Sequence, residues 1–180
     1  MNQIIKPKTF IVDFDGTCVR HEFPNIGKNI GAAPVLKALS DAGHRIILWT
    51  VRSHKEAPKY ANKEVKAKDG QLLNEAIQWF GENDIKLYKI NEVPEGQGRW
   101  SDSPKPHGTY IIDDLMLGDC VTFYESRRMV DWKIVMQYLY AEHLIEPLFL
   151  VPTGVVSLTY CAGITKEVRK EIEQFYLTDL

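Results

Sequence analysis

The sequence predicts an α/β fold in which helices pack against a parallel β-sheet. Short apolar runs that suit buried strands alternate along the chain with segments whose apolar residues recur at helical spacing. Polar side chains directly follow three of the apolar runs. In a parallel sheet these side chains meet at the carboxyl edge of the strands, where open α/β sheets bind their ligands. We expect one core domain over residues 1–145 and an extension over residues 146–180.

The individual elements follow from these patterns in chain order. Strands are expected at residues 10–12, 45–50, 85–90 and 109–112, and helices at residues 34–39, 72–80 and 134–139. Pro34 suits the first turn of its helix, and Gly43 follows the end of that helix. In the extension, residues 148–151 and 155–160 are expected to form a β-hairpin around residues 152–154, followed by a helix over residues 165–176.

Composition and charge limit the classes of function. The 180 residues are 44% hydrophobic and carry a net charge of −2, which argues against general electrostatic binding to nucleic acid. No apolar run approaches the roughly 18 residues that span a bilayer, and the N-terminus lacks the apolar region of a signal peptide. The three cysteines have no paired or metal-ligand spacing and suit the reducing cytoplasm. Residues 53–69 are rich in lysine, but interleaved acidic residues favour a solvated helical face over a surface that guides phosphates.

Two carboxylates follow the first predicted strand. Asp13 and Asp15 are two residues apart, so they leave the strand end on roughly the same side. At about 4 Å and an effective dielectric of about 20, their repulsion is on the order of 4 kcal/mol. A divalent cation, or a proton on one of the two carboxylates, would relieve this repulsion.

Two further strand ends carry polar side chains. Thr50 ends the second strand, where it suits either a phosphoryl oxygen or a simple strand cap. Asp113 and Asp114 end the fourth strand. Carboxylate and carbonyl oxygens are ligands for hard ions such as Mg²⁺. Because a parallel sheet brings its strand ends to one edge, we expect these acids and Thr50 to share a site.

The order of these motifs resembles that of the haloacid dehalogenase-like (HAD) hydrolases. Residues 13–17, Asp-Phe-Asp-Gly-Thr, are similar to the first HAD motif, Thr50 to the second, and Asp113 with Asp114 to the fourth. Residues 20–27, 48–52, 72–79, 112–114 and 131–132 together resemble a subgroup of small, uncharacterised bacterial HAD-like phosphatases, over roughly residues 8–140. The resemblance implies a three-layer, Rossmann-like parallel sheet with helices on both faces. The connections at residues 18–31 and 91–108 are too short for a cap domain, so an open site is expected.

The resemblance also implies a cytoplasmic, Mg²⁺-dependent phosphate monoester hydrolase. Asp13 would attack phosphorus and form an aspartyl-phosphate, and Asp15 would exchange protons with the leaving group and with water. The Mg²⁺ ion would be held by an Asp13 carboxylate oxygen, the Asp15 backbone carbonyl and Asp113. Asp114 would support the metal site.

Other residues would bind the phosphate group. By the same resemblance, Thr50 and a lysine would hold its oxygens, and Gly16 would let the backbone turn tightly towards it. We assign the lysine to Lys105, with Lys89 as the competing choice. Arg20 and His21 follow the first motif and suit either contact with the leaving group or a role at the surface.

The expected partner is a phosphorylated substrate, small or large. No membrane partner is expected, and a homo-oligomer stays open. One alternative is a polynucleotide or nucleotide phosphatase that uses residues 53–69 to track phosphates. An alternative of another class is a non-catalytic regulatory module that binds phosphate or metal. The intact pair of Asp13 and Asp15 favours turnover, because loss of the second acid is the simplest way to stop hydrolysis.

Overall fold

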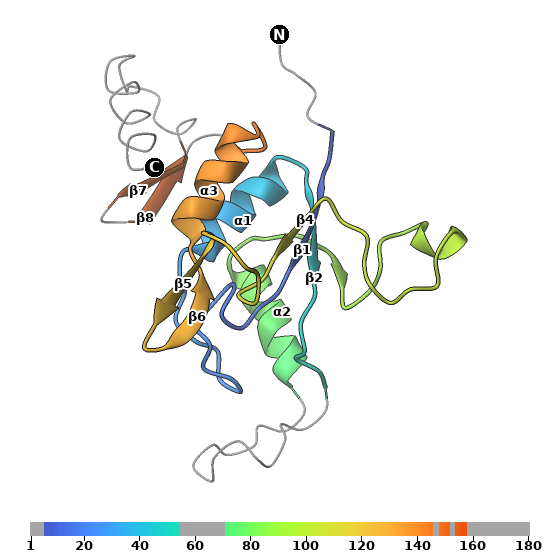
Figure 1. Cartoon of the computed structure of the whole chain (residues 1–180), viewed down its shortest axis with the longest axis horizontal. Helices are drawn as coiled ribbons and strands as arrows, with labels where there is room; N and C mark the ends of the chain where they lie inside the picture. The colour runs from blue at the N-terminus through green and yellow to red at the C-terminus, as the bar shows by residue number, and fades with distance from the viewer. Residues whose placement is uncertain (1–5, 55–70, 146–147, 152–153, 158–180) are drawn as a thin grey trace.

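The centre of the fold is a parallel β-sheet. The computed structural model describes residues 6–54, 71–145, 148–151 and 154–157. Four parallel strands pair in the order β3–β2–β1–β4 (Figure 1). Their bounds are β1 (Thr9–Val12), β2 (Arg45–Leu48), β3 (Leu87–Ile90) and β4 (Tyr110–Ile112). The predicted α/β class and all four predicted strands of the sheet are therefore confirmed.

Three helices accompany the sheet in the described residues, and each overlaps a predicted helix. They are α1 (Ala32–Asp41), α2 (Leu72–Glu82) and α3 (Trp132–Ala141). Side chains alternate along β1, so Phe10 and Val12 point into the core that the helices share. The apolar face of each helix closes that core, through residues such as Leu36, Phe80 and Leu139.

The three described helices lie on one face of the sheet, so the expected helix layer on the second face is wrong for this part of the chain. The strands β1, β2 and β3 are neighbours in chain order, and right-handed crossovers in one direction place α1 and α2 on the same face. Helix α3 packs against α1 on that face. Figure 1 shows the helices on one side of the strands and the connection between β3 and β4 on the other.

The connection between β3 and β4 covers the second face without a helix layer or a cap domain. It contains only a short 3₁₀ turn, η1 (Gln97–Arg99). The buried side chain of Gln97 organises it, because Nε2 donates to the carbonyls of Ser103 (3.1 Å) and Lys105 (2.8 Å). Gly108 then passes against β1, where an added Cβ would lie 2.8 Å from Cδ1 of Ile11.

A β-hairpin that the sequence did not predict follows β4. It pairs β5 (Val121–Tyr124) with β6 (Arg127–Val130) in antiparallel fashion. The two turn residues, Glu125 and Ser126, both have positive φ angles of 47° and 65°. The hairpin is fixed to the loop after β1, because the Val130 N–H donates to the Gly16 carbonyl at 2.8 Å.

Within the described residues, the extension contains the predicted hairpin. Here β7 (Leu148–Val151) pairs antiparallel with β8 (Gly154–Ser157). The helix predicted over residues 165–176 and most of the lysine-rich segment lie outside the described residues. The domain boundary at residue 145 stays a prediction. Across the described part of the chain, no helix has the length and apolar character needed to cross a membrane.

Candidate active site

Three carboxylates meet at the carboxyl edge of the sheet. Asp13 follows β1, and Asp113 and Asp114 follow the neighbouring strand β4. The Asp13 N–H donates to the Ile112 carbonyl at 3.1 Å, which continues the pairing of the two strands up to the site. One carboxylate oxygen from each aspartate lies within 4.8 Å of the others. We call Asp13, Asp113 and Asp114 the acidic cluster.

The electrostatics of the acidic cluster favour a bound cation. Burial is the largest cause that raises the pKa of Asp13 from 3.8 to about 7; a backbone hydrogen bond lowers this pKa, and the charges of Asp113, Asp15 and Asp114 contribute to the rise. Burial also raises the pKa of Asp114, with the charge of Asp113 as the second cause. Three mutually repelling oxygen donors fit a hard divalent cation such as Mg²⁺. The residues therefore fit the predicted metal, although the structure identifies no ion.

Gly16 and Thr17 hold the acidic cluster together. Gly16 has a φ of 83°, and an added Cβ would lie 2.6 Å from Oδ2 of Asp114, so only glycine fits this close approach. The Thr17 hydroxyl donates to Oδ2 of Asp13 at 3.4 Å and accepts from the Asp114 N–H at 3.0 Å. The Trp132 indole donates to the Thr17 carbonyl at 2.6 Å, so α3 also fixes this turn.

Asp15 does not join the acidic cluster. Its carboxylate forms a buried, bidentate ion pair with Arg52, from Nε to Oδ2 and from Nη2 to Oδ1, both at 2.7 Å. The guanidinium also donates to the carbonyls of Pro24 (3.1 Å) and Asn25 (2.7 Å) in the loop after β1. No sequence pattern pointed to this role for Arg52, which is only 1% exposed. Both Asp15 oxygens are thus occupied as acceptors.

Thr50 stands at the end of β2 with a hydroxyl proton to donate. Its N–H donates to Oδ1 of Asn91 at 2.8 Å, and its hydroxyl oxygen accepts from the Arg52 N–H at 3.2 Å. The Trp49 N–H donates to the Val12 carbonyl at 2.9 Å, so this strand end lies beside the start of the Asp13 loop. Thr50 therefore lies just beyond the end of β2 at the carboxyl edge of the sheet, and its role in phosphate binding stays a prediction.

The two candidate lysines, Lys105 and Lys89, lie among residues other than the acidic cluster. Lys105 is exposed on the connection between β3 and β4, and its carbonyl accepts from Gln97. Lys89 pairs with Glu92 at 3.2 Å. Within the described residues, neither lysine has a contact with the acidic cluster, so the choice between them stays a prediction.

The basic groups that do act on the acidic cluster are His21 and Arg128. Their charges lower the pKa of Asp114 against its burial. Arg128 Nε also donates to the Asp114 carbonyl at 2.8 Å. Arg128 belongs to the unpredicted hairpin, and no motif in the sequence pointed to it.

The fold and the acidic cluster define an α/β protein with a candidate cation site at the carboxyl edge of its sheet. A scan against protein-family models finds no match, and a search of curated proteins finds none either. Among solved structures, the chain is similar to a conserved protein from Bacteroides thetaiotaomicron, with 30% identity and a TM-score of 0.55 over 76% of this chain and 93% of that one. At this identity and coverage the chain belongs to the same family as that protein. The likeness brings no activity with it.

Proposed function

We propose that the protein is a Mg²⁺-dependent phosphate monoester hydrolase of the HAD type that forms an aspartyl-phosphate on Asp13. The observation that carries the proposal is the acidic cluster, which joins two neighbouring strand ends of a parallel sheet. The resemblance of residues 13–17, Thr50 and residues 113–114 to the HAD motifs supports it further.

Asp13 is the nucleophile in this proposal. One of its oxygens bonds to phosphorus as the bond from phosphorus to the leaving oxygen breaks, and the leaving oxygen takes up a proton. Water then attacks the phosphorus of the aspartyl-phosphate, which releases inorganic phosphate and regenerates the carboxylate. Bound Mg²⁺ would offset the negative charge of the nucleophile and the phosphate. Asp13, Asp113 and the Asp15 backbone carbonyl would hold it, with Asp114 in support.

Asp15 is the proton donor in this proposal. Because each of its oxygens accepts one hydrogen bond from Arg52, the proton would occupy a remaining lone pair of one oxygen and weaken that side of the ion pair. The Thr50 hydroxyl donates to a phosphoryl oxygen, and Lys105 contributes the balancing positive charge. Gly16 keeps the backbone turn narrow at this point.

The ion pair of Asp15 and Arg52 also supports a second candidate, a non-catalytic module that binds metal or phosphate. In that case the pair is purely structural and Asp15 never exchanges a proton. A polynucleotide phosphatase would share the chemistry of the first proposal and differ in substrate. Most of the lysine-rich segment that it would use lies outside the described residues.

The test is release of phosphate from p-nitrophenyl phosphate with Mg²⁺ and with chelator. We expect turnover with Mg²⁺ only, loss to background in Asp13→Asn, and a loss of roughly 10²–10⁴-fold in Asp15→Asn. Asp41→Asn is the matched control, because Asp41 pairs with Lys37 on the exposed face of α1. If Mg²⁺ raises the melting temperature but no phosphorylated compound is turned over, the non-catalytic module is correct.

A further inference from the structure

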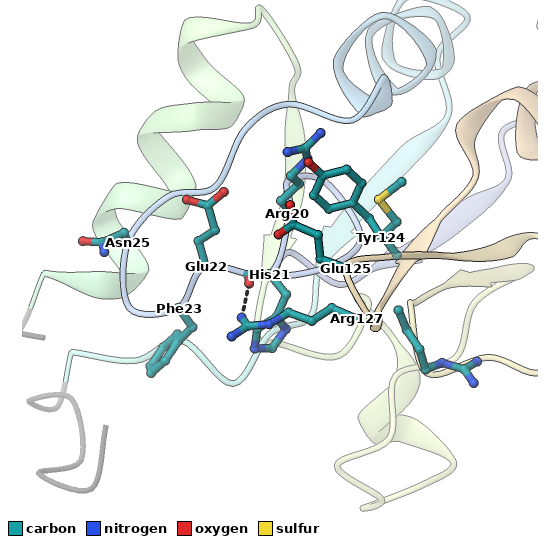
Figure 2. Close-up of a pocket in the computed structure, with 10 residues that line it drawn as sticks. Arg20, His21, Glu22, Phe23, Asn25, Tyr124, Glu125 and Arg127 are labelled. Atoms are coloured by element: carbon teal, nitrogen blue, oxygen red, sulfur yellow. Dashed lines mark hydrogen bonds between the residues drawn. The ribbon is translucent and has the colours of Figure 1, made fainter. Parts of the chain in front are cut away.

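A polar pocket lies beside the acidic cluster. Its volume is about 390 Å³, within the usual range for small-molecule sites. The loop after β1 contributes Arg20 and His21 to one wall, and the β5–β6 hairpin contributes Tyr124 and Arg127 to the other (Figure 2). Arg128 of the hairpin also lines the pocket. Arg128 joins the pocket to the acidic cluster, since its Nε donates to the Asp114 carbonyl.

Among the described residues that line this pocket, Arg20 has a side-chain N–H, on Nε, without a hydrogen-bond acceptor. Its guanidinium stacks on the Tyr124 ring, 3.7 Å from the ring centroid, and this stacking fixes the plane of the guanidinium. In the described part of the chain, the Arg20 Nε is buried and has no hydrogen-bond partner. A buried N–H without an acceptor is unfavourable, and an oxygen from a ligand would satisfy it once the Arg20 side chain shifts to admit that oxygen.

The other basic groups of the pocket are partly committed to the protein. Arg127 Nη1 donates to the His21 carbonyl, which joins the two walls (Figure 2). Arg128 donates to the carbonyls of Asp114 and Met116. Among the described residues, no protein acceptor is seen for the Arg20 guanidinium, the remaining N–H groups of Arg127 or the His21 ring, so these groups are open to a ligand.

The acidic residues of the pocket do not cancel this positive charge. Glu22 and Glu125 also line the pocket, but its three arginines, Arg20, Arg127 and Arg128, outnumber them. The pocket therefore combines a buried, unsatisfied arginine N–H with further cationic donors, next to a group of carboxylates that suits a cation and a phosphate.

We infer that this pocket binds a second anionic group of the substrate. The substrate class is then a phosphate monoester whose leaving group carries a carboxylate or another phosphate. This inference rests on the proposed function for the position of the scissile phosphate. Arg20 forms the principal contact with the second anion, and Arg127 and His21 assist it.

The pocket is tested first without metal or phosphate. In ¹⁵N–¹H spectra of the full chain, the Arg20 Nε–Hε signal, assigned by its loss in Arg20→Lys, should shift and saturate on titration with succinate. Arg45 is the reference, because it also stacks on a tyrosine (4.9 Å from the Tyr88 centroid) but starts β2 at the opposite edge of the sheet. No shift at Arg20, or an equal shift at Arg45, overturns the inference.

The second test measures selectivity by calorimetry in the presence of Mg²⁺. Phosphonates that carry a terminal carboxylate or a second phosphonate are compared with alkylphosphonates of the same length. In the wild type and in Arg45→Met, we expect the doubly anionic ligand of best length to bind roughly tenfold tighter or more than the alkylphosphonate of the same length. The better second group identifies the anion as carboxylate or phosphate.

The variants decide the role of Arg20. The tighter binding of the doubly anionic ligand should disappear in Arg20→Met and survive in part in Arg20→Lys. Unchanged melting temperatures of the two variants check that they fold. Equal affinities in the wild type, or an undiminished advantage in Arg20→Met, overturn the inference. A protein that shows the succinate shift but no phosphatase turnover refutes the proposed function and leaves the anion pocket standing. Phosphatase turnover without the succinate shift supports the proposed function and refutes the anion pocket.

Discussion

The stability of the metal-free protein should fall as the pH rises, because the fold disfavours the charged form of Asp13. The pKa of Asp13 is raised from 3.8 to about 7 by burial and by the neighbouring carboxylates. A carboxyl whose pKa is raised in the folded state does not lower the unfolding free energy at pH values below its unfolded pKa. Its cost grows as the pH rises and is complete above the folded pKa. The pH window of this effect is therefore about 4 to 7.

The size of the effect follows from the shift. A shift of about three pKa units corresponds to about 4 kcal/mol of unfolding free energy, at 1.36 kcal/mol per unit. Asp13 is only half-buried, and solvent screening reduces this value, so we expect a loss of about 2 kcal/mol between pH 5 and pH 8. Mg²⁺ should reverse the loss, because it stabilises the charged cluster at the higher pH.

The assay is urea unfolding at a series of pH values, with chelator and with Mg²⁺. Asp13→Asn should flatten the pH dependence and remove most of the stabilisation by Mg²⁺ at pH 8. Asp41→Asn should retain the wild-type behaviour, because the ion pair of Asp41 is exposed. Two outcomes would show that Asp13 does not carry the repulsion among these carboxylates. One is equal stability of the metal-free protein at pH 5 and pH 8, and the other is an unchanged slope of unfolding free energy against pH in Asp13→Asn.

Two further substitutions test the packing around the site. Arg52→Met should lower the unfolding free energy by about 3–5 kcal/mol in urea titrations, because it leaves the buried Asp15 carboxylate without its partner, whereas Arg45→Met at the sheet's other edge should change it far less. A loss below about 1 kcal/mol for Arg52→Met would contradict the ion pair. Gly16→Ala should lower the unfolding free energy by about 1–2 kcal/mol from the positive φ of Gly16 alone. It should also weaken Mg²⁺ binding by displacing Asp114, measured as the melting temperature with and without Mg²⁺. An unchanged response of the melting temperature to Mg²⁺ would refute the contact between Gly16 and Asp114.

The acidic cluster was predictable because two short-range rules are enough to place it. The apolar runs place Asp13 and Asp113 at strand ends, and a parallel sheet brings those ends to one edge; that β1 and β4 are neighbours is seen only in the structure. The ion pair of Asp15 and Arg52 was not predictable in this way. Its partners are 37 residues apart, in the segments that follow two different strands, and no spacing rule relates them.

Two errors of the fold prediction have equally specific causes. The face on which each helix packs depends on strand order, and the sequence pattern does not contain the order β3–β2–β1–β4. The β5–β6 hairpin was missed because its turn residues, Glu125 and Ser126, take positive φ angles without the Asn-Gly or Asp-Gly signal of such turns. That hairpin supplies Arg127 and Arg128, so the missing element also hid one wall of the pocket.

Arg52 links the Asp15 carboxylate to a later part of the same loop after β1. The same guanidinium holds the Asp15 carboxylate and the carbonyls of Pro24 and Asn25. Those carbonyls belong to the loop that also carries Arg20 into the pocket. A displacement of the loop by a ligand therefore changes the hydrogen bonding of Arg52, and through it the freedom of Asp15 to take up or release a proton.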